Sequence, residues 1–135
     1  MISVGRLLVS GSRTINDYRA FKKIIKQYDF ELLLHGAHWE GVDRLCADYA
    51  KEIQLGDREI KCPAKWKELG KSAGPNRNRA MAKFCYNEND RMLAIWDQKS
   101  KGTLDCIEAW EELYGRKRLD VWVIKKWNNF LRPLS

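Results

Sequence analysis

The amino-acid sequence predicts one α/β domain over residues 1–135, with a Rossmann-like, doubly wound and mainly parallel five-stranded sheet and helices on both faces. Two observations predict this class. Short apolar runs alternate with segments of helical period, and that order implies right-handed crossovers between parallel strands. The apolar runs are also continuous, which is typical of strands that are buried on both faces of a sheet. A chain of 135 residues is long enough to form one such domain around its own core.

The first half of the chain is expected to contain two strands and two helices. The strands are predicted at residues 6–10, before a glycine turn, and at residues 30–34. Between them, Thr14-x-x-Asp17 resembles a capping box and opens a helix. The apolar residues of this helix recur at helical spacing: Tyr18, Phe21, Ile25 and Tyr28. The second helix has the clearest amphipathic pattern, which is formed by Val42, Leu45, Cys46, Tyr49, Ala50 and Ile53.

The second half is expected to contain three more strands, with two helices between them. A third strand at residues 58–62 ends at a proline, and the fourth and fifth strands lie at residues 91–96 and 119–124. Pro75 suits the first turn of a helix that runs to about Tyr86, and a fourth helix covers residues 103–114. A last helical turn is expected in the tail, through Trp127, Phe130 and Leu131.

Composition restricts the class of protein and of partner. No apolar run approaches the ~20 residues of a membrane helix, and the run at residues 7–9 is too short for a signal peptide, so we expect a cytoplasmic protein without membrane contact. The net charge of +7 favours an anionic partner, but the basic residues are scattered, so nucleic acid is not the expected one. The four widely spaced cysteines predict reduced thiols, with no metal and no other cofactor. Homo-oligomer formation stays open.

Glycine-rich loops follow the first two predicted strands, where doubly wound sheets bind their ligands. Gly11-Ser12-Arg13 combines a tight turn with a guanidinium group suited to phosphate, ahead of a helix N-terminus. In the loop over residues 35–43, Gly36 allows close approach of a ligand, and Asp43 can bond a neighbouring loop or a ligand hydroxyl; Gly41 flanks the start of the next helix, near its cap. Either loop could also be a plain surface turn.

Two further loops carry basic and hydroxyl residues. The long connection over residues 63–78 ends at a helix N-terminus that holds Arg77 and Asn78, and an arginine there opposes the helix dipole unless an anion offsets it. A mobile, solvated loop is the alternative. After the fourth strand, residues 97–103 combine small residues, hydroxyls and lysines, as in a phosphate cradle. The chain has neither a Walker loop nor a Gly-x-Gly-x-x-Gly fingerprint.

These loops together resemble the YspA-like branch of the SLOG superfamily over residues 6–124. The resemblance rests on Gly11-Ser12-Arg13, His35-Gly36-Ala37 with Gly41-x-Asp43, Pro63-Ala64-x-Trp66, Ala73-Gly74-Pro75-x-Arg77-Asn78 and Trp96-Asp97-x-x-Ser100-Lys101-Gly102-Thr103. Gln98, where that branch is expected to have a glycine, and the bulky pair Trp39-Glu40 depart from it. The resemblance implies a Rossmann-like fold and a pocket for a nucleotide or an ADP-ribose-like ligand.

The expected ligand-binding residues are Gly11, Ser12, Arg13, His35, Gly36, Gly41, Asp43, Trp66, Gly74, Arg77, Asn78, Asp97, Ser100, Lys101, Gly102 and Thr103. The superfamily also contains LOG-type phosphoribohydrolases, which carry a Pro-Gly-Gly-x-Gly-Thr-x-x-Glu motif, and the DNA-binding DprA proteins. Gly102-Thr103 aligns with the Gly-Thr of that motif, but its glutamate falls on Cys106. The catalytic residues of an enzyme are therefore unknown, with Asp97 and Asp105 as candidates.

Three functions are consistent with these features. The first is a module that binds a nucleotide in the loops at the carboxyl ends of the strands, and so senses or sequesters it. The second is a LOG-like nucleotide phosphoribohydrolase, which needs a carboxylate within reach of the N-glycosidic bond. The third is a DprA-like nucleic-acid-binding protein, suggested by the net charge of +7 and the six tryptophans. The first is preferred, and whether the ligand is also hydrolysed stays open.

Overall fold

The computed structural model describes residues 4–124 and 131–133, and its centre is a six-stranded sheet in the order β3-β2-β1-β4-β5-β6. The strands are β1 (Arg6–Gly11), β2 (Leu32–His35), β3 (Glu59–Lys61), β4 (Arg91–Trp96), β5 (Leu119–Ile124) and β6 (Leu131–Pro133). Strands β1 to β5 are parallel, and β6 pairs with β5 in the antiparallel sense. The predicted parallel sheet is therefore confirmed, with one short strand added at its edge.

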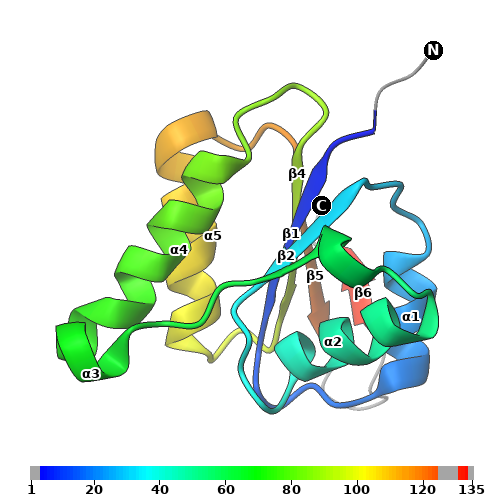
Figure 1. Cartoon of the computed structure of the whole chain (residues 1–135), viewed down its shortest axis with the longest axis horizontal. Coiled ribbons are helices and arrows are strands. Elements are labelled where there is room, and N and C mark those ends of the chain that lie inside the picture. The colour runs from blue at the N-terminus through cyan, green and yellow to red at the C-terminus, as the bar shows by residue number, and fades with distance from the viewer. Residues whose placement is uncertain (1–3, 125–130, 134–135) are drawn as a thin grey trace.

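Helices cover both faces of this sheet (Figure 1). Helices α1 (Tyr18–Ile25) and α2 (Val42–Glu52) lie on one face, and α4 (Ala73–Phe84) and α5 (Lys101–Tyr114) lie side by side on the other. The short helix α3 (Trp66–Leu69) and two 3-10 turns, η1 (Gly56–Arg58) and η2 (Gly70–Ser72), lie in the connections. This is the doubly wound arrangement that the sequence predicts. Among the described residues, no helix is both long enough and apolar enough to cross a membrane.

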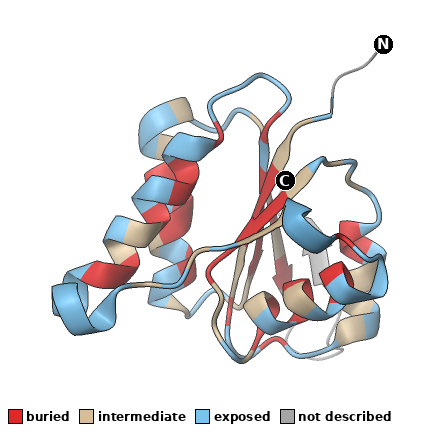
Figure 2. Cartoon of the chain, viewed as in Figure 1, coloured by how far each residue is buried: buried red, intermediate tan, exposed pale blue. Residues whose placement is uncertain are grey.

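Each face of the sheet has its own apolar core (Figure 2). Successive residues of β1 alternate between the two cores: Leu7 and Val9 pack with α1 and α2, whereas Leu8 packs with α4 and α5. Phe21 of α1 and Trp110 of α5 are the largest fully buried side chains, one in each core. Burial on both faces explains why the strands are continuous apolar runs in the sequence.

The order of the strands reverses between β1 and β4. From β1 the chain moves outward through β2 to β3, and it then returns to β4 on the other side of β1. The loops after β1 and β4 therefore lead to helices on opposite faces of the sheet, and the crevice between them is where this class of fold binds ligands. The register places Gly11, the last residue of β1, beside Ile95 of β4.

Some element boundaries differ from the predicted ones. Asp17, rather than Thr14, caps α1, because its Oδ1 accepts a hydrogen bond from the N–H of Ala20 over 3.1 Å. Helix α4 begins at Ala73, and Pro75 lies within its first turn, where the missing N–H has no helical acceptor to lose. The connection ahead of α4 is not irregular, because α3 and η2 occupy much of it.

The tail differs from the predicted helical turn. Trp127 and Phe130 lie outside the described residues, and Leu131 begins β6 instead of continuing a helix. Leu131 pairs with Ile124 of β5. A strand is favoured here because the edge of β5 presents backbone N–H and C=O groups that need partners.

Candidate functional site

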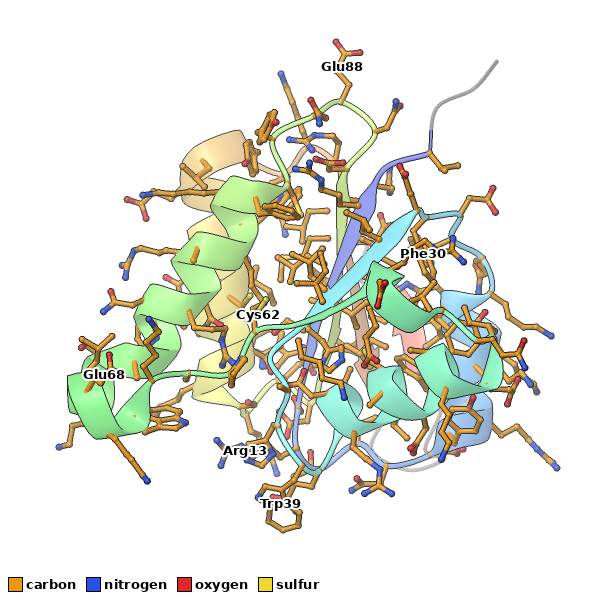
Figure 3. The ribbon with its side chains drawn as sticks, viewed as in Figure 1. Arg13, Phe30, Trp39, Cys62, Glu68 and Glu88 are labelled. Carbon is orange, nitrogen blue, oxygen red and sulfur yellow. The ribbon has the colours of Figure 1, made fainter. Side chains whose placement is uncertain are left out.

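A cleft of about 270 Å³ opens at the carboxyl ends of β1 and β2, next to the reversal of the strand order between β1 and β4. Its walls come from the last residues of β1, from the loop between β2 and α2, and from residues of α3, α4 and the start of α5. Figure 3 shows Arg13 and Trp39 at this edge of the molecule, beyond the ends of β1 and β2. The cleft therefore lies where the topology of the sheet predicts a ligand site.

The structure brings most of the predicted ligand-binding residues to this cleft. On its wall are Gly11, Arg13, Gly36, Asp43, Trp66, Arg77, Asn78, Ser100, Gly102 and Thr103. The predicted residues that lie off the wall are Ser12, His35, Gly41, Gly74, Asp97 and Lys101. Residues that line the cleft but were not predicted are Val9, Ser10, Ala37, His38, Glu40, Pro63, Ala64 and Met81. The residues on the wall are the ones placed to touch a ligand in the cleft, and contacts from the others stay predictions.

The N-terminus of α5 opens onto the cleft through Ser100, Gly102 and Thr103. Ser100 is the N-cap residue, but its side chain does not bond the helix backbone, and its Oγ accepts a hydrogen bond from the Thr103 hydroxyl over 3.2 Å. The N–H groups of the first turn have no acceptor within their own helix. A Cβ atom at Gly102 would meet nothing within 4 Å, so the space in front of this turn is open. An anion is favoured here by the free N–H groups and the helix dipole.

Asp97 joins the two loops that flank the strand reversal. Its Oδ1 accepts hydrogen bonds from the N–H groups of Lys99 (2.8 Å) and Ser100 (2.7 Å), and its Oδ2 accepts one from the Thr14 hydroxyl (2.7 Å). The N–H of Asp97 donates to Ser12 Oγ over 3.0 Å. Burial by itself would raise the pKa of Asp97, but these hydrogen bonds outweigh it and hold the pKa below its ordinary value. The carboxylate is therefore already occupied by donors of the protein itself.

Arg77 ties the ends of β2 and β3 to α4. Its Nη1 donates to the carbonyl oxygens of Gly36 (2.8 Å) and Cys62 (3.0 Å), and its Nε donates to Asn78 Oδ1 over 2.8 Å. The carbonyl oxygens accept hydrogen bonds from this cation, so Arg77 is not a plainly solvated side chain, and its contact with a ligand anion stays a prediction. Gly36 makes room for the guanidinium, since a Cβ atom there would lie 2.5 Å from Nη1 of Arg77.

Asn78 and Asp105 link α4 to α5. The buried Asn78 donates through its Nδ2 to Asp105 Oδ2 over 2.9 Å. Asp105 lies off the wall of the cleft, as does the other catalytic candidate, Asp97. The next residue, Cys106, is fully buried, and burial raises the pKa of its thiol to about 12. A buried neutral thiol cannot supply acid–base chemistry at this position.

His35 and Gly41 hold the two ends of the loop between β2 and α2 in place. The buried His35 accepts a hydrogen bond from the N–H of Ala37 at its Nδ1 (3.1 Å), and its Nε2 lies 2.7 Å from Glu59 Oε2. Because Nδ1 is the acceptor, Nε2 carries the proton that is donated to Glu59. Gly41 is the N-cap residue of α2 with a φ of 75°, a conformation that favours glycine, and it packs against the backbone of Arg13.

Two carboxylates of described residues lie on the wall, those of Glu40 and Asp43. Asp43 Oδ2 accepts a hydrogen bond from the N–H of His38 over 3.1 Å, and the N–H of Glu40 donates to His38 Nδ1 over 3.2 Å. These bonds fold the loop back on itself at the start of α2. Both carboxylates can therefore accept hydrogen bonds from a ligand hydroxyl.

The residues that were not predicted differ in the signal that the sequence carries for them. His38 and Glu40 lie between Gly36 and Gly41, and residues 63–64 directly follow a predicted strand, so their positions could have identified them. Ser10 lies at the end of an apolar run that was assigned to the sheet, and Met81 lies within α4. For those two residues, the sequence pattern contains no signal that separates cleft from core.

Among the described residues, no group of three or more His, Cys, Asp or Glu side chains is placed to hold a metal ion. No protein-family model, curated protein or solved structure matches the chain. The contacts and charges of the cleft are therefore the observations from which a function can be argued.

Proposed function

We propose that this protein binds a nucleotide or an ADP-ribose-like ligand in the cleft, as a sensor or as a module that sequesters the ligand. The observation that carries the proposal is the N-terminus of α5, which meets the cleft without a side-chain cap from any described residue. The resemblance to the YspA-like branch of the SLOG superfamily supports the same class of ligand, and we propose that the chain belongs to that branch.

The phosphate is proposed to bind between this N-terminus and the loop after β1. Arg13 lines the cleft and is exposed, and its guanidinium has no hydrogen bond or ion pair with another described residue. It can therefore turn its planar set of donors toward a phosphate. The hydroxyl of Ser100, which accepts a hydrogen bond from Thr103, keeps its own O–H as a donor beside the free N–H groups of α5. A helix N-terminus, a hydroxyl and a free guanidinium together are well suited to a phosphate ester.

The sugar is proposed to lie against the start of α2. Glu40 and Asp43 present carboxylate oxygens there, and an acidic residue that accepts hydrogen bonds from ribose hydroxyls is common in doubly wound nucleotide sites. The cleft volume of about 270 Å³ lies near the lower end of the ~300–1,000 Å³ that is usual for small-molecule sites. A ligand of mononucleotide size suits that volume, and a larger ligand would extend out of the mouth of the cleft.

Binding without rapid hydrolysis is the function that we propose. Asp97 already accepts three hydrogen bonds, and neither Asp97 nor Asp105 lies on the wall of the cleft where a scissile bond would be held. Release of free base from ordinary nucleoside monophosphates should therefore be weak or absent. Robust release that disappears in Asp97→Asn or Asp105→Asn would instead support a phosphoribohydrolase.

The proposal is tested by identifying what the cleft binds. The purified protein is denatured and the small molecules that it releases are identified by mass spectrometry. Calorimetric titrations with a nucleotide panel, including ADP-ribose and its cyclic forms, then measure the affinity of the same protein. A nucleotide-type ligand in both experiments supports the proposal. A protein that releases none and binds none of the panel would overturn it.

A further inference from the structure

Trp66 is an exposed aromatic residue on the wall of the cleft. The residue is 52% exposed, although it lies on a helix that is part of the described fold. By contrast, Trp96, Trp110 and Trp122 each donate a hydrogen bond through the indole Nε1 to another residue. Among the described residues, Trp66 has neither such an acceptor nor a stacked aromatic ring. An indole that is left open inside a polar cleft offers a flat surface to a ligand.

Gly74 determines where this indole lies. A Cβ atom at Gly74 would be 3.2 Å from Cη2 of Trp66 and 3.9 Å from Cζ2 and Cζ3. The six-membered ring therefore lies against the backbone of the first turn of α4, at a buried glycine. A methyl group at this position would require the ring to shift by a few tenths of an ångström, and a larger side chain would displace it. The indole thus has a defined place in the cleft without being covered.

The indole shares one space with the polar groups of the cleft. Pro63 and Ala64 precede α3 and line the cleft, as do Arg77 and Asn78, which follow Gly74 on α4. Ser100 and Thr103 of α5 line the same cleft. A ligand that has an anionic end and a flat aromatic end can therefore contact both the first turn of α5 and Trp66.

We propose that Trp66 is the platform on which the base of the nucleotide stacks, an inference that rests on the proposed nucleotide function. Every base has a π face, so a platform alone selects by stacking area rather than by hydrogen-bond pattern. Purine nucleotides therefore bind more tightly than pyrimidine nucleotides. Gly74 acts as a positioning residue, because it holds the indole in place without touching the ligand.

The experiment compares ligands with and without a base. Adenosine monophosphate and ribose 5-phosphate are titrated by calorimetry into the wild type, Trp66→Leu, Trp66→Phe and Trp39→Leu. Trp39 is the matched control, because it is 74% exposed and stacks on His38 with ring centroids 5.7 Å apart, but it lies off the wall of the cleft. Guanosine, cytidine and uridine monophosphates are included for the wild type, and thermal unfolding verifies that each variant is folded.

Trp66→Leu should lose about 5- to 150-fold in affinity for adenosine monophosphate, the usual range for stacking of one base, and nothing for ribose 5-phosphate. Trp66→Phe should retain most of the affinity, and Trp39→Leu all of it. Gly74→Val should weaken the binding of adenosine monophosphate only, because a side chain larger than a methyl group displaces the indole. Equal losses for both ligands in Trp66→Leu, or no loss, would overturn the platform while leaving nucleotide binding intact. Absence of nucleotide binding in the wild type would overturn the proposed function itself.

Discussion

The guanidinium of Arg77 is predicted to stabilise the fold whether or not a ligand is bound. It donates to two backbone carbonyls, those of Gly36 and Cys62, which follow different strands of the sheet. Arg77→Ala removes these charge-assisted hydrogen bonds and leaves both carbonyls without this donor. The free energy of unfolding should fall by about 1.5–3 kcal/mol, the scale for hydrogen bonds to charged groups. Denaturant unfolding of the unliganded protein measures it.

Arg79 is the matched control for this change. It lies on the same helix, is exposed, and makes no hydrogen bond or ion pair with another described residue. Arg79→Ala should therefore change the free energy of unfolding by no more than about 0.5 kcal/mol. Equal stabilities of Arg77→Ala and the wild type would mean that the carbonyls of Gly36 and Cys62 find water instead.

The carboxylate of Asp97 should make stability depend on pH in the acid range. Its pKa is lowered in the folded protein, because the N–H groups of Lys99 and Ser100 and the Thr14 hydroxyl favour the ionised form over the effect of burial. A carboxyl whose folded pKa is depressed contributes stability above its unfolded pKa, about 3.9, and this contribution is lost as the pH falls through the folded pKa.

Asp97→Asn therefore should be less stable than the wild type at pH 7, with a difference that shrinks as the pH falls below about 4. Denaturant unfolding at a series of pH values measures this difference between the two proteins. Asp57→Asn, an exposed residue of η1, is the control and should show no such trend. A difference that stays constant down to pH 2 would show that the ionised form of Asp97 is not preferentially stabilised.

The first turn of α5 is the element on which phosphate binding is proposed to depend. Gly102→Val places a side chain where a Cβ atom meets nothing within 4 Å, so the fold should tolerate it. The valine would occupy the open space in front of the free N–H groups, and nucleotide affinity should fall below detection in a calorimetric titration. Leu104→Val introduces the same residue at an exposed position of α5 off the wall, and should bind as the wild type does. Unchanged affinity of Gly102→Val would place the phosphate elsewhere.

The sheet and its main helices could be predicted because apolar periodicity reports burial directly. β4 and β5 begin and end at the predicted residues 91–96 and 119–124, since each is mostly apolar, with Arg91 opening the first range and Asp120 interrupting the second. α3 could not be predicted, because its four residues form little more than one turn and show no period. That omission matters for function, since α3 carries Trp66 into the cleft.

The location of the cleft was easier to predict than the hydrogen bonds of the residues around it. Ser12 and Asp97 lie in loops that the sequence indicates. They are joined by a hydrogen bond across 85 positions of the chain, and neither of them lines the cleft. His35 likewise bonds Ala37 and Glu59. A residue type and its place after a strand indicate that it can bind a polar group. Which polar group it binds depends on elements far along the chain, and that information appears only in the folded structure.

Acidic side chains neutralise part of the positive charge of the molecule locally. The net charge is +7, but several basic residues pair with acids, as in Arg44 with Asp48, Arg91 with Asp120, and Arg116 with Glu111. Exposed pairs of this kind add little stability, yet they reduce the positive potential that a polyanion would meet. A nucleotide in a cleft and a nucleic acid on the surface therefore differ in how salt affects them.

Binding to duplex DNA releases counterions, so its affinity falls with salt at a log–log slope of about −0.9 for each neutralised phosphate. A nucleotide held by directed hydrogen bonds in the cleft should respond more gently. We therefore expect any DNA binding to be weak and to disappear near physiological ionic strength, where the screening length is ~8 Å, while a nucleotide stays bound. Titrations across a salt series, one with a short duplex and one with ADP-ribose and mononucleotides, measure both slopes. Tight DNA binding that survives physiological salt, together with no nucleotide binding, would contradict the proposal and support a DprA-like function. Basic side chains from separate parts of the chain would then act together along one polyanion.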